Sequence, residues 1–328
     1  MKARFIKYFL LAFFSVISTC VICNFLVDHV QYYRRNITYP LYCNDRWQVA
    51  CFIHNFSFDT AIIGTSLTQN FSLGNIKEEI GGNPIKLSIA GATIPEQLLV
   101  VNSAIKFGKL KKVIWGIDRS YFYSRIGMRD SMPISLYTRR VDAHIKYLAN
   151  LDILAQSLRV LFGKTTTNPE ETLEFYNSWW KTTIFSRNIV LKLYENSLEE
   201  KINPRDSTSN RKEELFSNIL TVVNMHPEIE FIFFFPPYSL AYHKKEYQVN
   251  QVGFYEDMKF RKIMLEELTK IKNVKIFDFE TDLNIIANLD NYKDLNHYSN
   301  HVNDYMIKCI SKQKKLIEPR NITSSQRD

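Results

Sequence analysis

Short apolar runs that stop at glycine, proline or acidic residues recur along the chain and alternate with segments of helical periodicity. The composition and boundaries of these runs predict buried strands at Thr60–Gly64, Pro84–Ala90, Lys112–Ile117, Glu230–Phe235 and Val274–Phe279. Strands that alternate with helices along a chain form a parallel sheet with right-handed connections. The pattern therefore predicts an α/β fold.

The clearest helix start is the sequence Thr93-Ile94-Pro95-Glu96, which has the spacing of a capping box with an early proline. It predicts a helix over Pro95–Phe107. Apolar residues at helical spacing predict further helices over Lys212–Met225, Phe254–Lys272 and His301–Ile310.

The alternation is lost between Tyr121 and Asn210, apart from a helix predicted around Val141–Phe162. This stretch is too long for a simple loop in a compact domain, so we expect it to be an inserted cap. The cap is rich in aromatic residues, which either line a glycan or acyl groove or simply pack together. They are Tyr121, Phe122, Tyr123, Trp179 and Trp180.

These patterns divide the chain into an anchor, a stalk, a discontinuous α/β domain, a cap and a polar tail. The stalk lacks clear periodicity, and the tail is too polar to be ordered by burial. The expected bounds are 1–28 for the cytoplasmic tip and anchor, 29–58 for the stalk, 59–120 and 211–311 for the α/β domain, 121–210 for the cap and 312–328 for a disordered tail.

The anchor is the segment Tyr8–Val27, 20 residues without a charge, which is long enough as a helix to cross a bilayer. Lys2, Arg4 and Lys7 precede it, and the positive-inside rule then places the N-terminus in the cytoplasm. Arg34 and Arg35 after the span weaken this argument. No small-residue cleavage site follows the apolar run, so we expect an uncleaved single-pass protein with its main domain periplasmic or extracellular.

Composition and charge argue against some classes of binding partner. The net charge is +8, but the basic residues are scattered and form no stripe, which argues against nucleic acid. No cysteine or histidine cluster outside the span has metal-site spacing, so we expect no metal. Cys43 and Cys51 flank a short loop outside the cytoplasm; a disulfide between them and two unpaired thiols both fit the spacing.

Candidate chemistry begins at Ser66, in the stretch Asp59–Phe71 where the first predicted strand breaks into a polar turn at Gly64. Ligands of open α/β sheets bind beyond the carboxyl ends of the strands, which is where this serine is expected. A serine hydroxyl is a weak nucleophile until a base takes its proton. The alternative is that Ser66 only caps the following turn.

A base and its orienting acid are available near the other end of the chain, in the sequence Asp294-Leu295-Asn296-His297. A separation of three residues lets both side chains project from one turn toward the same site, as a Ser-His-Asp triad requires. The alternative is a capping aspartate beside an incidental histidine.

Together, the serine after the first strand and the late Asp-x-x-His resemble the SGNH/GDSL hydrolases, from about Asp59 to Lys308 with an unmatched middle. The resemblance implies a flavodoxin-like three-layer parallel sheet, with Ser66 as nucleophile, His297 as base and Asp294 as its orienter. No cofactor is implied. One membrane anchor before such a domain looks most like DltD-type envelope acyl-transfer proteins.

In the resembled family, the oxyanion donors are the nucleophile's backbone N–H, a glycine after the second strand and an asparagine after the third. Ser66 and Gly91 match the first two. The third departs from the pattern, because Asp118-Arg119 follows the third strand instead of an asparagine. Asn70 and Arg119 are the candidate substitutes.

The resemblance and the anchor lead us to expect an extracytoplasmic serine esterase or O-acyltransferase that acts on acyl esters of an envelope glycan or polymer, with membrane acyl-transfer proteins as possible partners. The missing asparagine motivates an alternative, a catalytically silent protein of the same fold that binds an envelope glycan or a partner protein. A third hypothesis is a soluble esterase released by signal cleavage.

Overall fold

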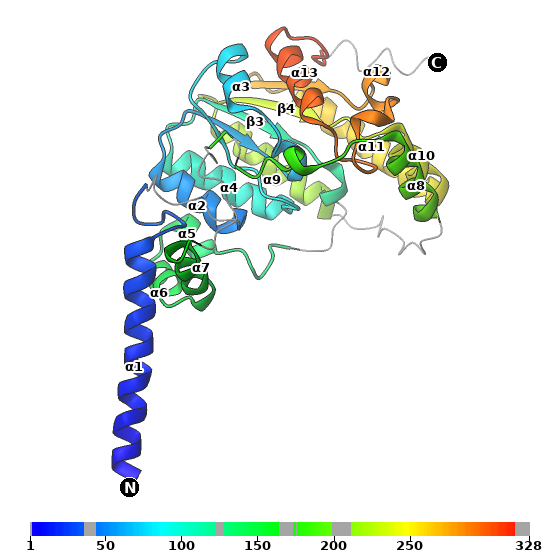
Figure 1. Cartoon of the computed structure of the whole chain (residues 1–328). Coiled ribbons are helices and arrows are strands. Elements are labelled where there is room, and N and C mark those ends of the chain that lie inside the picture. The colour runs from blue at the N-terminus through cyan, green and yellow to red at the C-terminus, as the bar shows by residue number, and fades with distance from the viewer. Residues whose placement is uncertain are drawn as a thin grey trace. The chain divides into compact units, whose positions relative to one another are not determined.

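The computed structural model (Figure 1) describes residues 2–35, 44–122, 127–163, 173–174, 176–198 and 211–318. The chain forms two compact units. The first joins Met1–Phe56 with Asp130–Thr172, and the second joins Ser57–Arg129 with Leu173–Asp328. The segment expected to be one inserted cap is therefore divided between the two units.

The second unit is built on a parallel sheet with the strand order β2-β1-β3-β4-β5. In register, Ala61 of β1 lies between Ile85 of β2 and Val113 of β3. The predicted α/β class with a parallel sheet is confirmed. The strands are β1 (Thr60–Ile63), β2 (Pro84–Lys86), β3 (Lys112–Gly116), β4 (Glu230–Phe235) and β5 (Val274–Asp278).

This strand order reverses direction between β1 and β3, the two strands from which the chain moves outward to opposite edges. Such a reversal leaves a crevice at the carboxyl ends of the two strands, and ligands of open α/β sheets bind there. The residues that follow Ile63 and Gly116 are thereby placed at the position where a site is expected.

Helices cover both faces of the sheet. On one face, Ile62, Ile114 and Ile232 belong to a core that includes residues of α3 (Leu73–Glu79), α8 (Arg187–Leu198), α10 (Leu240–Val249) and α13 (Asn300–Ser311). Side chains that alternate with these along the strands point to the other face. The helices that cover this second face are α4 (Ile94–Phe107), α9 (Arg211–Met225) and α11 (Gln251–Leu268).

Contacts on the second face are both polar and aromatic. The Trp115 indole of β3 donates to Gln97 Oε1 of α4 at 2.8 Å. Phe260 of α11 packs against Phe216 of α9 and against Phe122. The remaining short helices of this unit are η1 (Ser66–Thr68), η2 (Arg119–Phe122), η3 (Trp179–Thr182), α12 (Leu283–Ile286) and η4 (Leu289–Asn291).

The predicted helix start at Thr93 is confirmed: the Thr93 side chain accepts from Glu96 N while the Glu96 carboxylate accepts from Thr93 N. The predicted second strand ends early, at Lys86. Its backbone still pairs with β1 beyond that point, through Leu87 N to Ile62 O at 2.9 Å. Helix α10 was not predicted from the sequence.

The chain after α13 differs from the expected disordered tail as far as it is described. Leu316 forms an antiparallel bridge with Phe277, and Ile317 N donates to Ile276 O at 2.9 Å. These residues therefore cover the outer edge of β5, which would otherwise present unpaired backbone groups. Residues 319–328 lie outside the described residues.

The first unit is helical. Its helix α1 contains a 24-residue stretch, Arg4–Val27, that is long and apolar enough to cross a membrane. The Arg34 guanidinium donates to the carbonyls of Phe25 and Leu26, both at 2.6 Å, and so caps the end of α1. The helices of this unit are α1 (Lys2–Val27), α2 (Asp45–Asn55), α5 (Ile134–Thr138), α6 (Asp142–Leu148) and α7 (Leu151–Leu161).

Helix α2 occupies the segment expected to be a stalk without regular structure. Five successive residues, Val49 to Ile53, are buried, so the helix buries side chains on all its sides and not on one face alone. This explains why no amphipathic period marks it. Cys51 is a buried free thiol in the described part of the chain, and Cys43, with which either a disulfide or two unpaired thiols fitted the spacing, lies outside the described residues.

Candidate active site

Ser66 lies on a rigid turn at the carboxyl end of β1. Gly64 has φ +150°, and a Cβ there would lie 2.7 Å from Thr68 Cγ2, so only glycine fits. Thr65 starts the 3₁₀ helix η1, and its hydroxyl accepts from Leu67 N at 3.4 Å. The Ser66 side chain that follows is half-buried.

The structure brings Ser66 together with His297 and Asp294. Ser66 Oγ and His297 Nε2 are 2.8 Å apart, and His297 Nδ1 lies 2.8 Å from Asp294 Oδ2. The loop between η4 and α13 holds this arrangement, because the backbone N–H groups of Asn296 and His297 both donate to Asp294 Oδ1, at 3.0 and 2.8 Å.

The charge of Asp294 suits it to orient the histidine. Burial disfavours its ionised form, but hydrogen bonds from the His297 ring and from the backbone outweigh burial and hold the pKa of Asp294 below its usual value. An ionised Asp294 accepts from Nδ1–H of His297. In the neutral ring with this tautomer, Nε2 carries no proton and accepts the hydrogen bond of the Ser66 hydroxyl, which is the arrangement that a general base requires.

Gly91 lies where the chain turns after β2. Its φ is +60°, a conformation that favours glycine, and Ala92 N donates to Ile89 O at 3.0 Å to close the turn. Backbone pairing of Ile89 N with Gly64 O, at 3.1 Å, ties this turn to the end of β1. The structure therefore places Gly91 at the same edge of the sheet as Ser66.

Asn70 is almost fully buried, with 3% of its surface exposed, four residues after Ser66. Its Oδ1 accepts from Trp180 N at 3.3 Å, which fixes the orientation of the amide because only the oxygen can accept. Its Nδ2 has no hydrogen-bond partner among the described residues. A buried donor without a partner is unfavourable unless a ligand or water fills that place, so Asn70 is suited to receive one.

Arg119 does not meet the expectation that it serves as an oxyanion donor. It is fully buried, and its two terminal nitrogens bind the carboxylates of Asp257 and Glu280. Asp118, the residue before Arg119, accepts from Thr65 Oγ1 at 3.2 Å and from the Tyr238 hydroxyl. Asp118 thus supports the residue before the serine.

The segment around η3, residues 176–187, passes over the triad, and we call it the strap. Trp179 Nε1 donates to the Ser66 carbonyl at 3.0 Å, and the indole meets the His297 ring edge-on at 5.4 Å between centroids. Lys293 Nζ lies 4.0 Å from the centroid of the same indole. Trp179 was predicted only as part of an aromatic groove or packing cluster, and the structure places it on two members of the triad.

Of the other aromatic residues expected in the cap, Trp180 is tied to Asn70 through its backbone, and Phe122 is buried in the sheet unit. The side chain of Tyr121 and the whole of Tyr123 lie outside the described parts of the chain.

Lys86 was not singled out from the sequence, yet it contacts the first part of the strap and the residues before it. This lysine of β2 is 3% exposed. Its ammonium nitrogen lies 3.1 Å from Gln69 O, 2.7 Å from Glu174 O and 3.0 Å from Ser178 Oγ. It therefore joins the turn that carries Ser66 and Asn70 to the residues that lead into Trp179.

Burial lowers the pKa of Lys86 to about 7, against a weaker opposing effect of Glu174. The folded chain then binds fewer protons than the unfolded chain between about pH 7 and the ordinary value near 10.5. Stability must rise with pH across this window.

We predict that the unfolding free energy of the wild type, relative to Lys86→Met, increases by about 2–4 kcal/mol between about pH 7 and pH 10. Denaturant unfolding of the detergent-solubilised full chain at both pH values measures it. Lys77→Met, at an exposed lysine of α3, is the matched control and should show no such difference. A constant difference between the wild type and Lys86→Met would contradict the prediction.

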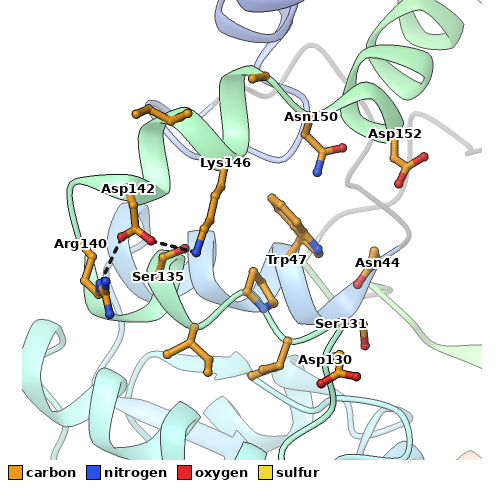
Figure 2. A pocket seen from close by; sticks show the side chains of 15 residues that line it. Asn44, Trp47, Asp130, Ser131, Ser135, Arg140, Asp142, Lys146, Asn150 and Asp152 are labelled. Atoms are coloured by element: carbon orange, nitrogen blue, oxygen red, sulfur yellow. Dashed lines mark hydrogen bonds and ion pairs between the residues drawn. The ribbon is translucent and has the colours of Figure 1, made fainter.

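A separate cavity of about 820 Å³ is lined entirely by residues of the first unit (Figure 2). Trp47 of α2 and the polar side chains of Asp130, Asn150 and Asp152 contribute to its wall. None of the triad residues lines it.

A scan against protein-family models found no match, and a search of curated proteins found no relative of this chain. The functional argument therefore depends on the geometry of the site.

Proposed function

We propose that this chain is a membrane-anchored, extracytoplasmic serine esterase or O-acyltransferase of the SGNH type. In this proposal Ser66 attacks an ester carbonyl, His297 takes the serine proton and returns it to the leaving alcohol, and Asp294 stabilises the imidazolium. The acyl group then passes from Ser66 to water or to a hydroxyl of an envelope glycan or polymer.

The observation that carries the proposal is the continuous hydrogen-bonded series from Ser66 Oγ through the His297 ring to Asp294, with 2.8 Å at each step. A serine that only capped a turn would need no histidine at hydrogen-bond distance from its hydroxyl. The strand order and the position of Ser66 after β1 agree with the proposal, since open α/β sheets bind ligands in the crevice at this point of the sheet.

Acyl transfer also requires donors to the oxyanion. We propose the backbone N–H groups of Ser66 and Gly91 and, as replacement for the missing asparagine, the side chain of Asn70. The support for Asn70 is its buried Nδ2 without a partner and its link through Trp180 to the strap.

The anchor and the basic residues before it support a location outside the cytoplasm. Lys2, Arg4 and Lys7 lie before the uncharged run Tyr8–Val27 of α1, whereas the Arg34 guanidinium after this run caps the end of the helix. A domain held at a membrane acts more readily on a surface polymer than on a dilute soluble ester, which favours an acylated glycan or polymer as substrate. Membrane proteins that deliver acyl groups are the proposed partners.

The alternative, a silent binding protein of the same fold, was motivated by the absent asparagine. It would be favoured by a serine and histidine held apart, and the short Ser66–His297 distance argues against it.

The test is labelling of the full-length chain with a serine-reactive fluorophosphonate, followed by peptide mass spectrometry. We expect one adduct, on Ser66. A folded protein whose Ser66 remains unmodified, also after prolonged labelling with the smaller diisopropyl fluorophosphate, would favour the silent binding protein.

For Asn70, we predict that Asn70→Asp lowers kcat for a chromogenic aryl ester by about 10²–10³ with a smaller change in KM, because oxyanion donors act in the transition state. The aspartate still accepts from Trp180 N but cannot donate, so the strap contact is kept. Asn70→Ala, which removes both, should be no more active. An unchanged kcat in the aspartate variant would exclude Asn70 as a donor.

A further inference from the structure

Helices α6 and α7 follow one another across a short turn, and both contact the carboxyl-terminal part of α1 (Figure 1). We call this helix–turn–helix segment the α6–α7 hairpin. Its turn is held by Asn24 of α1, whose Nδ2 donates to the carbonyls of Leu148 and Asn150, both at 3.0 Å. Cys20 Sγ, one turn earlier, donates to the Leu148 carbonyl at 3.3 Å. The hairpin thus contacts α1 within its apolar stretch.

The depth of this contact follows from the helix rise. At about 1.5 Å per residue, Asn24 lies about 5 Å, and Cys20 about 10 Å, before the end of α1 at Val27. The candidate span begins at Arg4, so its length exceeds a hydrocarbon core of about 30 Å by only a few ångströms at each end. If α1 crosses the bilayer, the turn of the hairpin lies below the level at which hydrocarbon begins.

One side of α7 is buried against α1. Ser157 Oγ donates to Asn24 Oδ1 at 3.1 Å and lies 3.2 Å from His29 Nδ1, while Ile153 is fully buried. Both Asn150 and Ser157 contact Asn24, so two turns of α7 lie at the level of this residue.

The neighbouring side of α7 is apolar and exposed. Leu151 and Phe162 expose 66% and 73% of their surface, and Leu161 exposes half. Leu154 and Leu158 lie between them, half-buried. These five residues form an apolar arc, which we call the α7 arc.

At the same level α1 itself exposes Ile22, Phe25 and Leu26. The α7 arc therefore continues the surface that α1 would present to lipid. The third side of α7 carries Asp152, Gln156 and Arg159. Asp152 also lines the cavity in Figure 2, so the helix is divided between an apolar and a polar side.

The polar contacts at the turn also fit a lipid environment. Hydrocarbon offers no hydrogen bonds, so backbone carbonyls at a helix end must be satisfied within the protein. Asn24 does this for two carbonyls and is itself completely buried. An asparagine in the apolar stretch of α1 is thereby explained.

We infer that the α6–α7 hairpin is inserted into the bilayer leaflet that holds the carboxyl-terminal end of α1, with the α7 arc against lipid acyl chains and Asp152, Gln156 and Arg159 toward water. The inference rests on the proposed anchoring through α1. It makes the first unit a membrane-embedded platform instead of a stalk.

The test places an environment-sensitive fluorescent amino acid, one site at a time, at Phe13, Leu151 or Asp152 of the full chain in nanodiscs. Phe13 reports on α1, and Asp152 is the matched neighbour of Leu151 on the hydrated side. Quenching by lipids brominated in the acyl chains should be at least about twofold stronger at Phe13 and Leu151 than at Asp152.

The outcomes separate the hairpin from the anchor. Strong quenching at Phe13 with equal, weak quenching at Leu151 and Asp152 would overturn the inference and leave the anchor intact; the α7 arc would then be free for a partner protein. Weak quenching at Phe13 would overturn both. Because all three side chains are exposed or half-exposed, the substitutions leave the packed interior unchanged.

Discussion

Replacing Ser66 by alanine is expected to lower kcat for an activated ester by roughly 10³–10⁶, the range found when a triad nucleophile is removed. His297→Ala should cost a similar factor, and the double variant little more, because the two side chains act as one unit linked at 2.8 Å. Turnover of a chromogenic aryl ester by the full-length chain in detergent measures all three.

The aspartate gives a graded result within the same series. Asp294→Asn keeps the shape of the side chain but offers a donor to Nδ1, so it favours the wrong histidine tautomer; a loss of up to about 10⁴ in kcat is expected. The loop is preserved in this variant, because the amide oxygen still accepts the hydrogen bonds that Asn296 N and His297 N donate to Asp294 Oδ1.

Ser72→Ala is the matched control for the serine. Ser72 caps α3, where its hydroxyl accepts from Asn75 N at 3.1 Å. Its loss should reduce stability by about 1 kcal/mol and leave kcat unchanged. Equal activity of the wild type and Ser66→Ala would remove the proposed nucleophile.

The second large effect is on stability. Arg119→Met is expected to destabilise the chain by about 3–5 kcal/mol, because removing one partner of a buried ion pair leaves the other charge uncompensated. Arg119 forms ion pairs with both Asp257 and Glu280. Burial raises the pKa of the Glu280 carboxyl, but the positive charges of Arg119 and Arg261 outweigh this effect and hold that pKa below its usual value. Urea unfolding measures the loss.

Lys262→Met provides the comparison, because Lys262 forms an exposed ion pair with Glu266 on α11. Its loss should lower the free energy of unfolding by at most about 0.5 kcal/mol. If Arg119→Met does not accumulate as folded protein, Arg119→Lys keeps the charge but not the two-sided contact, and an intermediate loss is expected. A loss of less than 1 kcal/mol in both Arg119 variants would contradict the assigned role.

The elements of the fold could be predicted from the sequence where buried residues recur in a local pattern. The strands are apolar runs closed by breakers, and the capping box at Thr93 marks its helix within one residue. The single helix predicted around Val141–Phe162 is two helices, because Asn150 caps α7 by accepting from Ile153 N at 3.0 Å. An asparagine before an amphipathic run was a usable signal for that break.

Only some residues of the candidate site could be predicted from the sequence, for physical reasons. Ser66, Asp294 and His297 could be paired because a resemblance joined two distant motifs, and the structure brings them together. Trp179 and Lys86 act through contacts between segments far apart in sequence, which no local period encodes. A lysine within a buried strand was the one available sign for Lys86, since lysine is seldom fully buried.

Ser66 and His297 lie 231 residues apart, and the strands β2, β3, β4 and β5 are formed by the chain between them. Contacts of such long sequence separation form late in folding. In a chain that emerges N-terminus first, Ser66 is made long before His297. Under the proposed mechanism, the serine therefore stays inactive until nearly the whole protein has been synthesised and its last strand has joined the sheet.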